Sequence, residues 1–265
     1  LTDVTGVQTC ALPICLGVSA ETRDFSGLSG GHSFSRIIDA VVPGALPSTL
    51  IVAAPVDGDG FAAALALSLL ADTGDNPPVT LRFLFLGGEG GAPLGSRLFL
   101  QDFFPQDPAA VLYLNPRGAG EYVFQTGARG VVAPSWMVKR IGDAASVSGL
   151  RHRVLGIRNQ TFRFGLADTV SPAKEYLRAG YPAISVEGGI PGGETGFDDF
   201  RGFFRTFLRE NSGGFPGEWA RHYVFFRFGN RSVVIEEPVI IGVLLLVLGL
   251  SLLYPLIFRG YMLRY

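Results

Sequence analysis

The chain has 265 residues, a formal net charge of −1 and 48% hydrophobic residues. A charge this close to zero argues against a nucleic-acid partner, because nucleic-acid surfaces need a basic excess on one face or along one helix. Both cysteines, Cys10 and Cys15, lie at the start of the chain, so disulfides and cysteine-ligated metal sites are not expected in the folded part. The length suits one domain of about 200 residues plus an appendage.

Residues 1–14 read differently from the rest of the chain. The stretch LTDVTGVQTCALPI has neither strand alternation nor a helical period, and it lacks the features of a signal peptide. Its part VTGVQTCALPI resembles the in-frame translation of a sequencing-library adapter, as found in reading frames taken from raw metagenomic assemblies. We therefore expect residues 1–14 to be an artefact; the alternative is a natural, poorly ordered N-terminus.

The other end of the chain carries the clearest physical signal. Residues 238–258 read PVIIGVLLLVLGLSLLYPLIF and contain no charge, so they are long and apolar enough to span a bilayer. A buried core helix of this length would normally have a polar stripe. Glutamates precede the run, whereas Arg259 and Arg264 follow it. The positive-inside rule then predicts a cytoplasmic tail over 259–265 and an outward-facing domain. We expect the membrane to be a bacterial inner membrane.

Between these ends, short apolar runs alternate with helical patterns. The run 79–88 is apolar on both faces, as in strands that lie in the middle of a sheet covered on both sides. The repetition predicts an α/β three-layer sandwich with a mostly parallel central sheet over residues 15–195, followed by one C-terminal transmembrane helix. Strands are expected at 33–44, 48–57, 79–88, 109–115, 152–158 and 181–189, and helices at 61–72, 95–104, 135–147 and 171–180. An amphipathic helical connector is expected over 196–237, with helices at 197–210 and 217–229.

Polar, glycine-rich stretches follow several of the expected strands. In doubly wound sheets, ligands bind beyond the carboxyl ends of the strands. The acidic residues there have ordinary readings as well, because a lone Glu89 suits a helix-capping or solvated role and Asp57, Asp59 and Asp168 suit turns. Ser96 has no histidine near it in sequence, which argues against a serine hydrolase. The stretches are APVDGDG (54–60), GGEGGAPLGS (87–96), LNPRGAGE (114–121) and DTVSPAKEYLRAGYP (168–182).

The order of these stretches resembles the di-zinc aminopeptidase superfamily, peptidase family M twenty-eight, which includes bacterial leucyl aminopeptidases, glutaminyl cyclases, nicastrin and nicalin. The likeness covers roughly residues 33–190. Its most specific motif is an apolar strand, then Gly-Glu, then Leu-Gly-Ser, with Ser96 seven positions after Glu89. The resemblance implies a zinc-exopeptidase-like fold, a zinc site and hydrolase activity, with Glu89 at the general-base position and Asp57 at the position of the orienting aspartate.

The zinc-ligand positions depart from this family pattern. A bridging aspartate is ambiguous, because only Asp57 or Asp59 could serve. Catalytic zinc sites usually have three protein ligands, most often histidines, and the three histidines of this chain do not follow the carboxyl end of any expected strand. We therefore expect no bound zinc and no other cofactor. The positions that correspond to lost ligands hold Pro55, Gly90, Asn115 and Ala173.

Three functional hypotheses remain. The first is a membrane-anchored, extracytoplasmic pseudopeptidase whose former cleft binds a protein or peptide, with lining residues Asp59, Asn115, Ser96 and Asp168. The second is an active metal-dependent hydrolase with an atypical ligand set. The third is a lumenal brace for a multi-span membrane complex. The second hypothesis would draw its ligands from Asp57, Asp59, Glu89 and Glu121.

Overall fold

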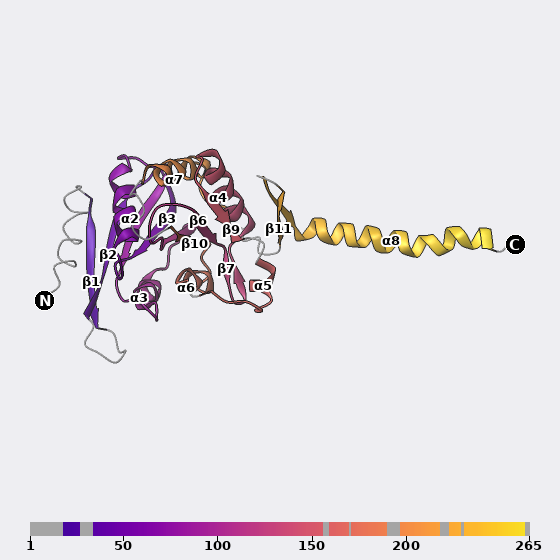
Figure 1. Cartoon of the computed structure of the whole chain (residues 1–265), viewed down its shortest axis with the longest axis horizontal. Coiled ribbons are helices and arrows are strands. Elements are labelled where there is room, and N and C mark those ends of the chain that lie inside the picture. Colours follow the sequence, from indigo (N-terminus) through magenta and orange to yellow (C-terminus); the bar gives the residue numbers. More distant parts are fainter. Residues whose placement is uncertain are drawn as a thin grey trace.

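A computed structural model describes most of the chain between residue 18 and residue 262. The described residues are 18–26, 34–155, 159–169, 171–189, 197–217, 223–228 and 231–262. Figure 1 shows a layered domain from which one long helix projects. Residues 1–14, which we expect to be an artefact, lie outside the described part.

The described part of the domain is built around an eight-stranded sheet with the order β1-β2-β4-β3-β5-β10-β6-β9. The four central strands β4, β3, β5 and β10 run parallel to one another, whereas β1 and β2 at one edge pair antiparallel. On the other side β6 pairs antiparallel with β10 and parallel with β9. The strands are β1 (Ala20–Ser26), β2 (Phe34–Val42), β3 (Leu46–Pro55), β4 (Val79–Leu86), β5 (Ala109–Leu114), β6 (Tyr122–Gln125), β9 (His152–Val154) and β10 (Ala183–Gly188).

Helices cover both faces of this sheet (Figure 1). One face carries α2 (Phe61–Asp72), α4 (Ser135–Val147) and α7 (Asp198–Glu210), which contact one another through α7. The other face carries α3 (Leu94–Asp102) and α6 (Ala173–Arg178). The predicted α/β sandwich with a mostly parallel central sheet is therefore confirmed. Smaller elements are β7 (Gly127–Ala128), β8 (Val131–Val132) and α5 (Asn159–Arg163).

The segment expected to be a helical connector consists of two different structures. Its first part is α7, whose phenylalanines at three- and four-residue spacing form one buried face against the sheet. Its second part is a hairpin of β11 (Tyr223–Phe228) and β12 (Arg231–Glu236), so the helix predicted over 217–229 is wrong for the described residues 223–228. Aromatic and β-branched residues favour strands, and the Gly-Asn pair at 229–230 is a typical hairpin connection.

The hairpin leads directly into α8 (Glu237–Met262). With 26 residues, this helix is about 39 Å long at 1.5 Å per residue. Its window 237–254 has a mean hydropathy of 2.2 and is not buried against the domain. Within the described residues, α8 is the one helix long and apolar enough to cross a membrane, as predicted, and Figure 1 shows it extending away from the domain.

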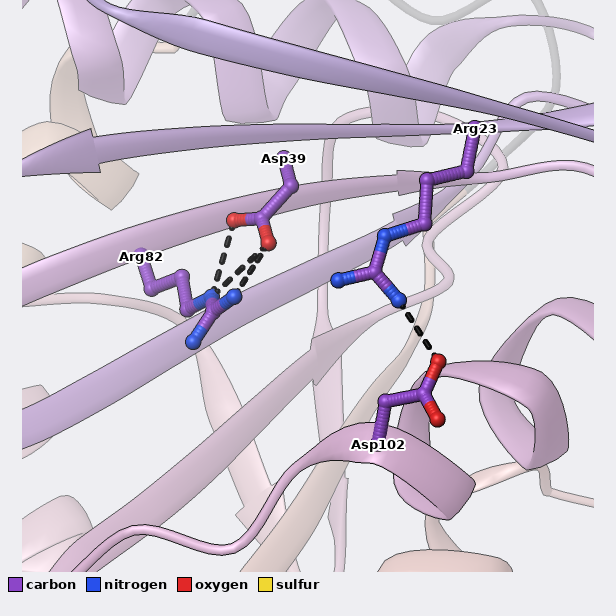
Figure 2. A network of polar contacts seen from close by, with 4 residues as sticks. All are labelled: Arg23, Asp39, Arg82 and Asp102. Atoms are coloured by element: carbon purple, nitrogen blue, oxygen red, sulfur yellow. Dashed lines mark hydrogen bonds and ion pairs between the residues drawn. The ribbon is translucent and has the colours of Figure 1, made fainter.

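A mostly buried ion pair holds β2, β4 and α3 together on the second face of the sheet (Figure 2). Asp39 of β2 is 5% exposed and accepts two hydrogen bonds from the Arg82 Nε atom of β4, at 2.8 and 3.0 Å. The same guanidinium lies 5.1 Å from the ring centroids of Phe99 and Phe103. These contacts fix the C-terminal half of α3, the helix whose N-terminus forms part of the candidate site.

We predict that Arg82→Ala lowers the free energy of unfolding by about 3–5 kcal/mol, because it leaves the Asp39 carboxylate buried without its partner. Arg23→Ala is the matched control, since the Arg23–Asp102 pair is exposed (Figure 2) and should contribute about 0–1 kcal/mol. Urea denaturation of the detergent-solubilised chain measures both. Equal losses in the two variants would contradict this account.

Candidate functional site

A pocket of about 390 Å³ lies beyond the carboxyl ends of β3 and β5. This is the edge at which ligands bind in parallel α/β sheets. The structure here brings together four of the residues selected from the sequence: Pro55, Asp57, Asp59 and Asn115. The remaining lining residues are Gly58, Gly60, Ala62, Pro116 and Arg117.

The two aspartates of the pocket hold backbone groups in place. The Asp59 carboxylate accepts a hydrogen bond from the Phe61 N–H at 3.0 Å, at the start of α2. The Asp57 carboxylate accepts the Glu89 N–H at 2.6 Å and so ties the loop after β3 to the end of β4. Gly60, with a φ of 78°, turns the chain from the loop after β3 into α2. Both aspartates therefore have structural roles that do not require a ligand.

Glu89 follows β4, and its carboxylate is turned into the protein. The residue is 7% exposed. One carboxylate oxygen accepts the Ser96 N–H at 2.7 Å, and the other accepts the Ser96 hydroxyl at 2.9 Å and the Tyr113 hydroxyl at 2.8 Å. Glu89 is not one of the residues that line the pocket. We call Glu89, Ser96 and Tyr113 the Glu89 cluster.

The Leu-Gly-Ser motif makes this cluster sterically feasible. Ser96 lies in the first turn of α3, where the backbone N–H has no partner within the helix and can bind a carboxylate. Gly95 packs against the end of β4 so closely that a Cβ atom would lie 2.6 Å from the Gly87 carbonyl oxygen. Only glycine therefore allows α3 to approach Glu89 at this distance.

Burial dominates the electrostatics of the Glu89 cluster. Burial raises the pKa of Glu89, and the hydrogen bonds from Ser96 and Tyr113 only partly offset this rise. Burial also raises the pKa of the Tyr113 hydroxyl, and the neighbouring carboxyl group raises it further. The Tyr176 hydroxyl is buried nearby, and its ring centroid lies 6.4 Å from that of Tyr113. The cluster is therefore a polar site in the protein interior.

The other residues selected from the sequence lie away from the pocket lining. Ser96 belongs to the Glu89 cluster and is fully buried. Asp168 accepts the N–H groups of Arg129 at 3.2 Å and Thr169 at 2.8 Å, as expected for a turn. Glu121 faces Arg153 at 3.9 Å, with both side chains half-exposed, and Ala173 begins α6 in the core.

Two residues with chemically important side chains at the site were not selected from the sequence. Arg117 lines the pocket and adds a positive charge to it; its place directly after a predicted strand was the available signal. Tyr113 lies in β5, every residue of which is buried. A tyrosine within an apolar strand gives no sign of its hydrogen-bond partner, so the sequence held no signal for this role.

The donors around the pocket do not fit a zinc site. Over the described ranges, no three His, Cys, Asp or Glu side chains lie together in a way that could hold a metal ion. The third possible oxygen donor in the pocket lining, beside Asp57 and Asp59, is the neutral amide of Asn115. His152 lies on the edge strand β9 and contacts the Leu150 carbonyl oxygen at 2.8 Å. Zinc sites need three strong donors at one point.

Comparison with known proteins identifies the fold. A glutaminyl cyclase from Porphyromonas gingivalis is 12% identical with a TM-score of 0.58, over 78% of this chain and 88% of that chain. A Zn-dependent exopeptidase from Parabacteroides distasonis is 13% identical with a TM-score of 0.53, over 77% and 87% of the two chains. A leucine aminopeptidase precursor from Bacteroides thetaiotaomicron is 14% identical with a TM-score of 0.52, over 77% and 86%.

Sequence comparison adds one family. The model of the first domain of the TP_0564 family matches residues 92–235, which is more than half of the chain. No curated protein sequence matches this chain. The structural matches show the fold of zinc exopeptidases and glutaminyl cyclases, in agreement with the expected fold.

We predict that Glu89→Ala lowers the free energy of unfolding by about 2–4 kcal/mol, because it leaves the Ser96 and Tyr113 donors buried without an acceptor. Glu89→Gln should change it by less than about 1 kcal/mol at neutral pH, since the amide oxygen still accepts from Ser96 and the Tyr113 hydroxyl can turn to accept from the amide. Urea denaturation of both variants in detergent measures this difference. Equal destabilisation by the two substitutions would contradict it.

Folding raises the pKa of Glu89 above the usual 4.5. This group therefore makes the folded state less stable as the pH rises from 4.5 through the raised pKa. We therefore predict that the stability of Glu89→Gln relative to the wild type increases as the pH rises above the ordinary glutamate pKa of 4.5. Urea midpoints at a series of pH values measure the difference. A constant or falling difference would show that Glu89 is not held in a desolvated site.

Proposed function

This chain belongs to the TP_0564 family, and we propose that it is a membrane-anchored, aminopeptidase-like binding protein whose pocket holds a peptide or protein without cleaving it. The fold of zinc exopeptidases and glutaminyl cyclases supplies the framework. The assignment of a binding role depends on the site itself, because one fold hosts many functions.

The enclosure of Glu89 is the observation that carries this proposal. A general base must reach the water or proton on which it acts within hydrogen-bond distance. The Glu89 carboxylate instead accepts three hydrogen bonds from Ser96 and Tyr113, inside the protein and off the pocket lining. In this proposal Glu89 is a structural residue that fastens α3 to the sheet.

The pocket itself retains groups that suit recognition. Asp57 and Asp59 are exposed at its rim and offer carboxylate oxygens to an amine, while Arg117 offers a guanidinium to a carboxylate or a carbonyl. Negative and positive groups around one opening suit a peptide, which carries amine, carbonyl and carboxylate groups. No step of bond cleavage is part of this proposal.

Membrane anchoring is the second part of the proposal. The apolar helix α8 is the candidate span, and Arg259 near its C-terminal end supports a cytoplasmic location for that end, with the α/β domain outside. The pocket would then face the extracytoplasmic space of a bacterial cell. Soluble peptides or the exposed segments of other membrane proteins would both have access to it.

Zinc analysis of the full chain tests the loss of catalysis. After dialysis against zinc and then zinc-free buffer, we predict far less than one tightly bound zinc per chain and no turnover of aminoacyl substrates. One or two retained zinc ions would refute the binding role, as would turnover that Glu89→Gln abolishes without lowering the melting temperature. That second result would instead support the active hydrolase with an atypical ligand set.

Alkaline extraction tests the anchor. We predict that the full chain stays with the membrane fraction at pH about 11, because a run of this length and hydropathy inserts stably. A variant with Leu245→Arg and Leu248→Arg tests whether the apolar run causes this retention. Its two central charges make insertion less favourable by about 5–7 kcal/mol on the insertion scale. Release of the unmodified chain would contradict the anchor.

A further inference from the structure

The loop after α5 carries two large apolar side chains at the surface. Phe164 is 71% exposed and Leu166 is 79% exposed. They flank Gly165, whose φ of 69° turns the chain sharply between them. Exposed residues of this size are costly in water, and together with Val233 of β12 they make three of the five strongly exposed large apolar residues that the structure describes outside α8.

This loop is joined to the foot of α8 by a short chain of contacts. Asn159 and Gln160 of α5 donate hydrogen bonds to the Tyr223 hydroxyl at 2.7 Å and the Tyr223 carbonyl oxygen at 2.8 Å. Tyr223 pairs in register with Glu236, the residue directly before α8. Direct contacts through α5 and β11 therefore link the loop to the residue before α8.

The same end of the domain also offers a positive charge. Arg129 is exposed and packs over the turn of the loop, because a Cβ atom on Gly165 would lie 3.8 Å from the Arg129 Cγ atom. None of the described residues forms an ion pair with Arg129. An apolar tip beside an exposed guanidinium is typical of a segment that sits among lipid headgroups.

We propose that residues 164–166 dip into the headgroup layer of the leaflet that α8 enters, with Arg129 against lipid phosphates. This inference rests on the proposed membrane span of α8. Figure 1 shows α5 and the hairpin at the end of the domain that faces α8, so a bilayer around α8 would lie beside the loop. The contact gives the domain a second point of attachment and fixes which way its pocket faces relative to the membrane.

Tryptophan quenching by brominated lipids tests the contact on the full chain in vesicles that contain anionic lipid. Phe164→Trp places a reporter on the loop, and Phe104→Trp is the matched control. Phe104 is 80% exposed and follows α3 by two residues, and Figure 1 shows α3 in the part of the domain away from α8. Emission of the wild type is subtracted to remove the two native tryptophans.

We expect the reporter at position 164 to emit at shorter wavelength and to lose most of its intensity in brominated vesicles, while the control keeps its intensity. Adding Arg129→Glu should restore part of the emission at position 164. Chains that resist alkaline extraction but show equal, weak quenching at both positions would overturn the loop contact alone. Release of the chain at alkaline pH would overturn the contact together with the membrane span.

Discussion

The candidate site depends on how one buried carboxyl group is held. Glu89 accepts hydrogen bonds from the N-terminal turn of α3 and from the Tyr113 hydroxyl of β5. These bonds join a loop, a helix and a central strand at the edge where ligands enter folds of this kind. A group held in this way stabilises the edge, and Glu89 is not among the residues that line the pocket.

The rest of the molecule fits around this constraint. The Asp39–Arg82 pair fixes the far half of α3, so that helix is held at both ends. Asp57 connects the pocket loop to the backbone of Glu89, which leaves an opening framed by carboxylates and one guanidinium. At the end of the domain opposite β1 (Figure 1), the hairpin joins the domain to α8 through β12. The proposed binding domain on a membrane-spanning helix accounts for these features.

Periodicity predicted much of this architecture, because the central strands and the helices over them have long, consistent apolar patterns, as in the fully buried β5. The sequence also placed Asp57, Asp59 and Asn115 at one edge. It failed where local pattern is weak or ambiguous: the aromatic run of β11 suits a helix face as well as a strand. The inward turn of Glu89 depends on Tyr113, which is distant in sequence, and no local pattern reveals such a pairing.

Infrared difference spectroscopy tests the enclosure of Glu89 most directly. Subtracting the spectra of Glu89→Gln from those of the wild type isolates the carboxyl band of this one residue over a pH titration. The account predicts a midpoint above the usual glutamate value of 4.5, unchanged when zinc is added. A midpoint at or below that value, or one that zinc lowers, would show a carboxylate open to the pocket and would contradict the account.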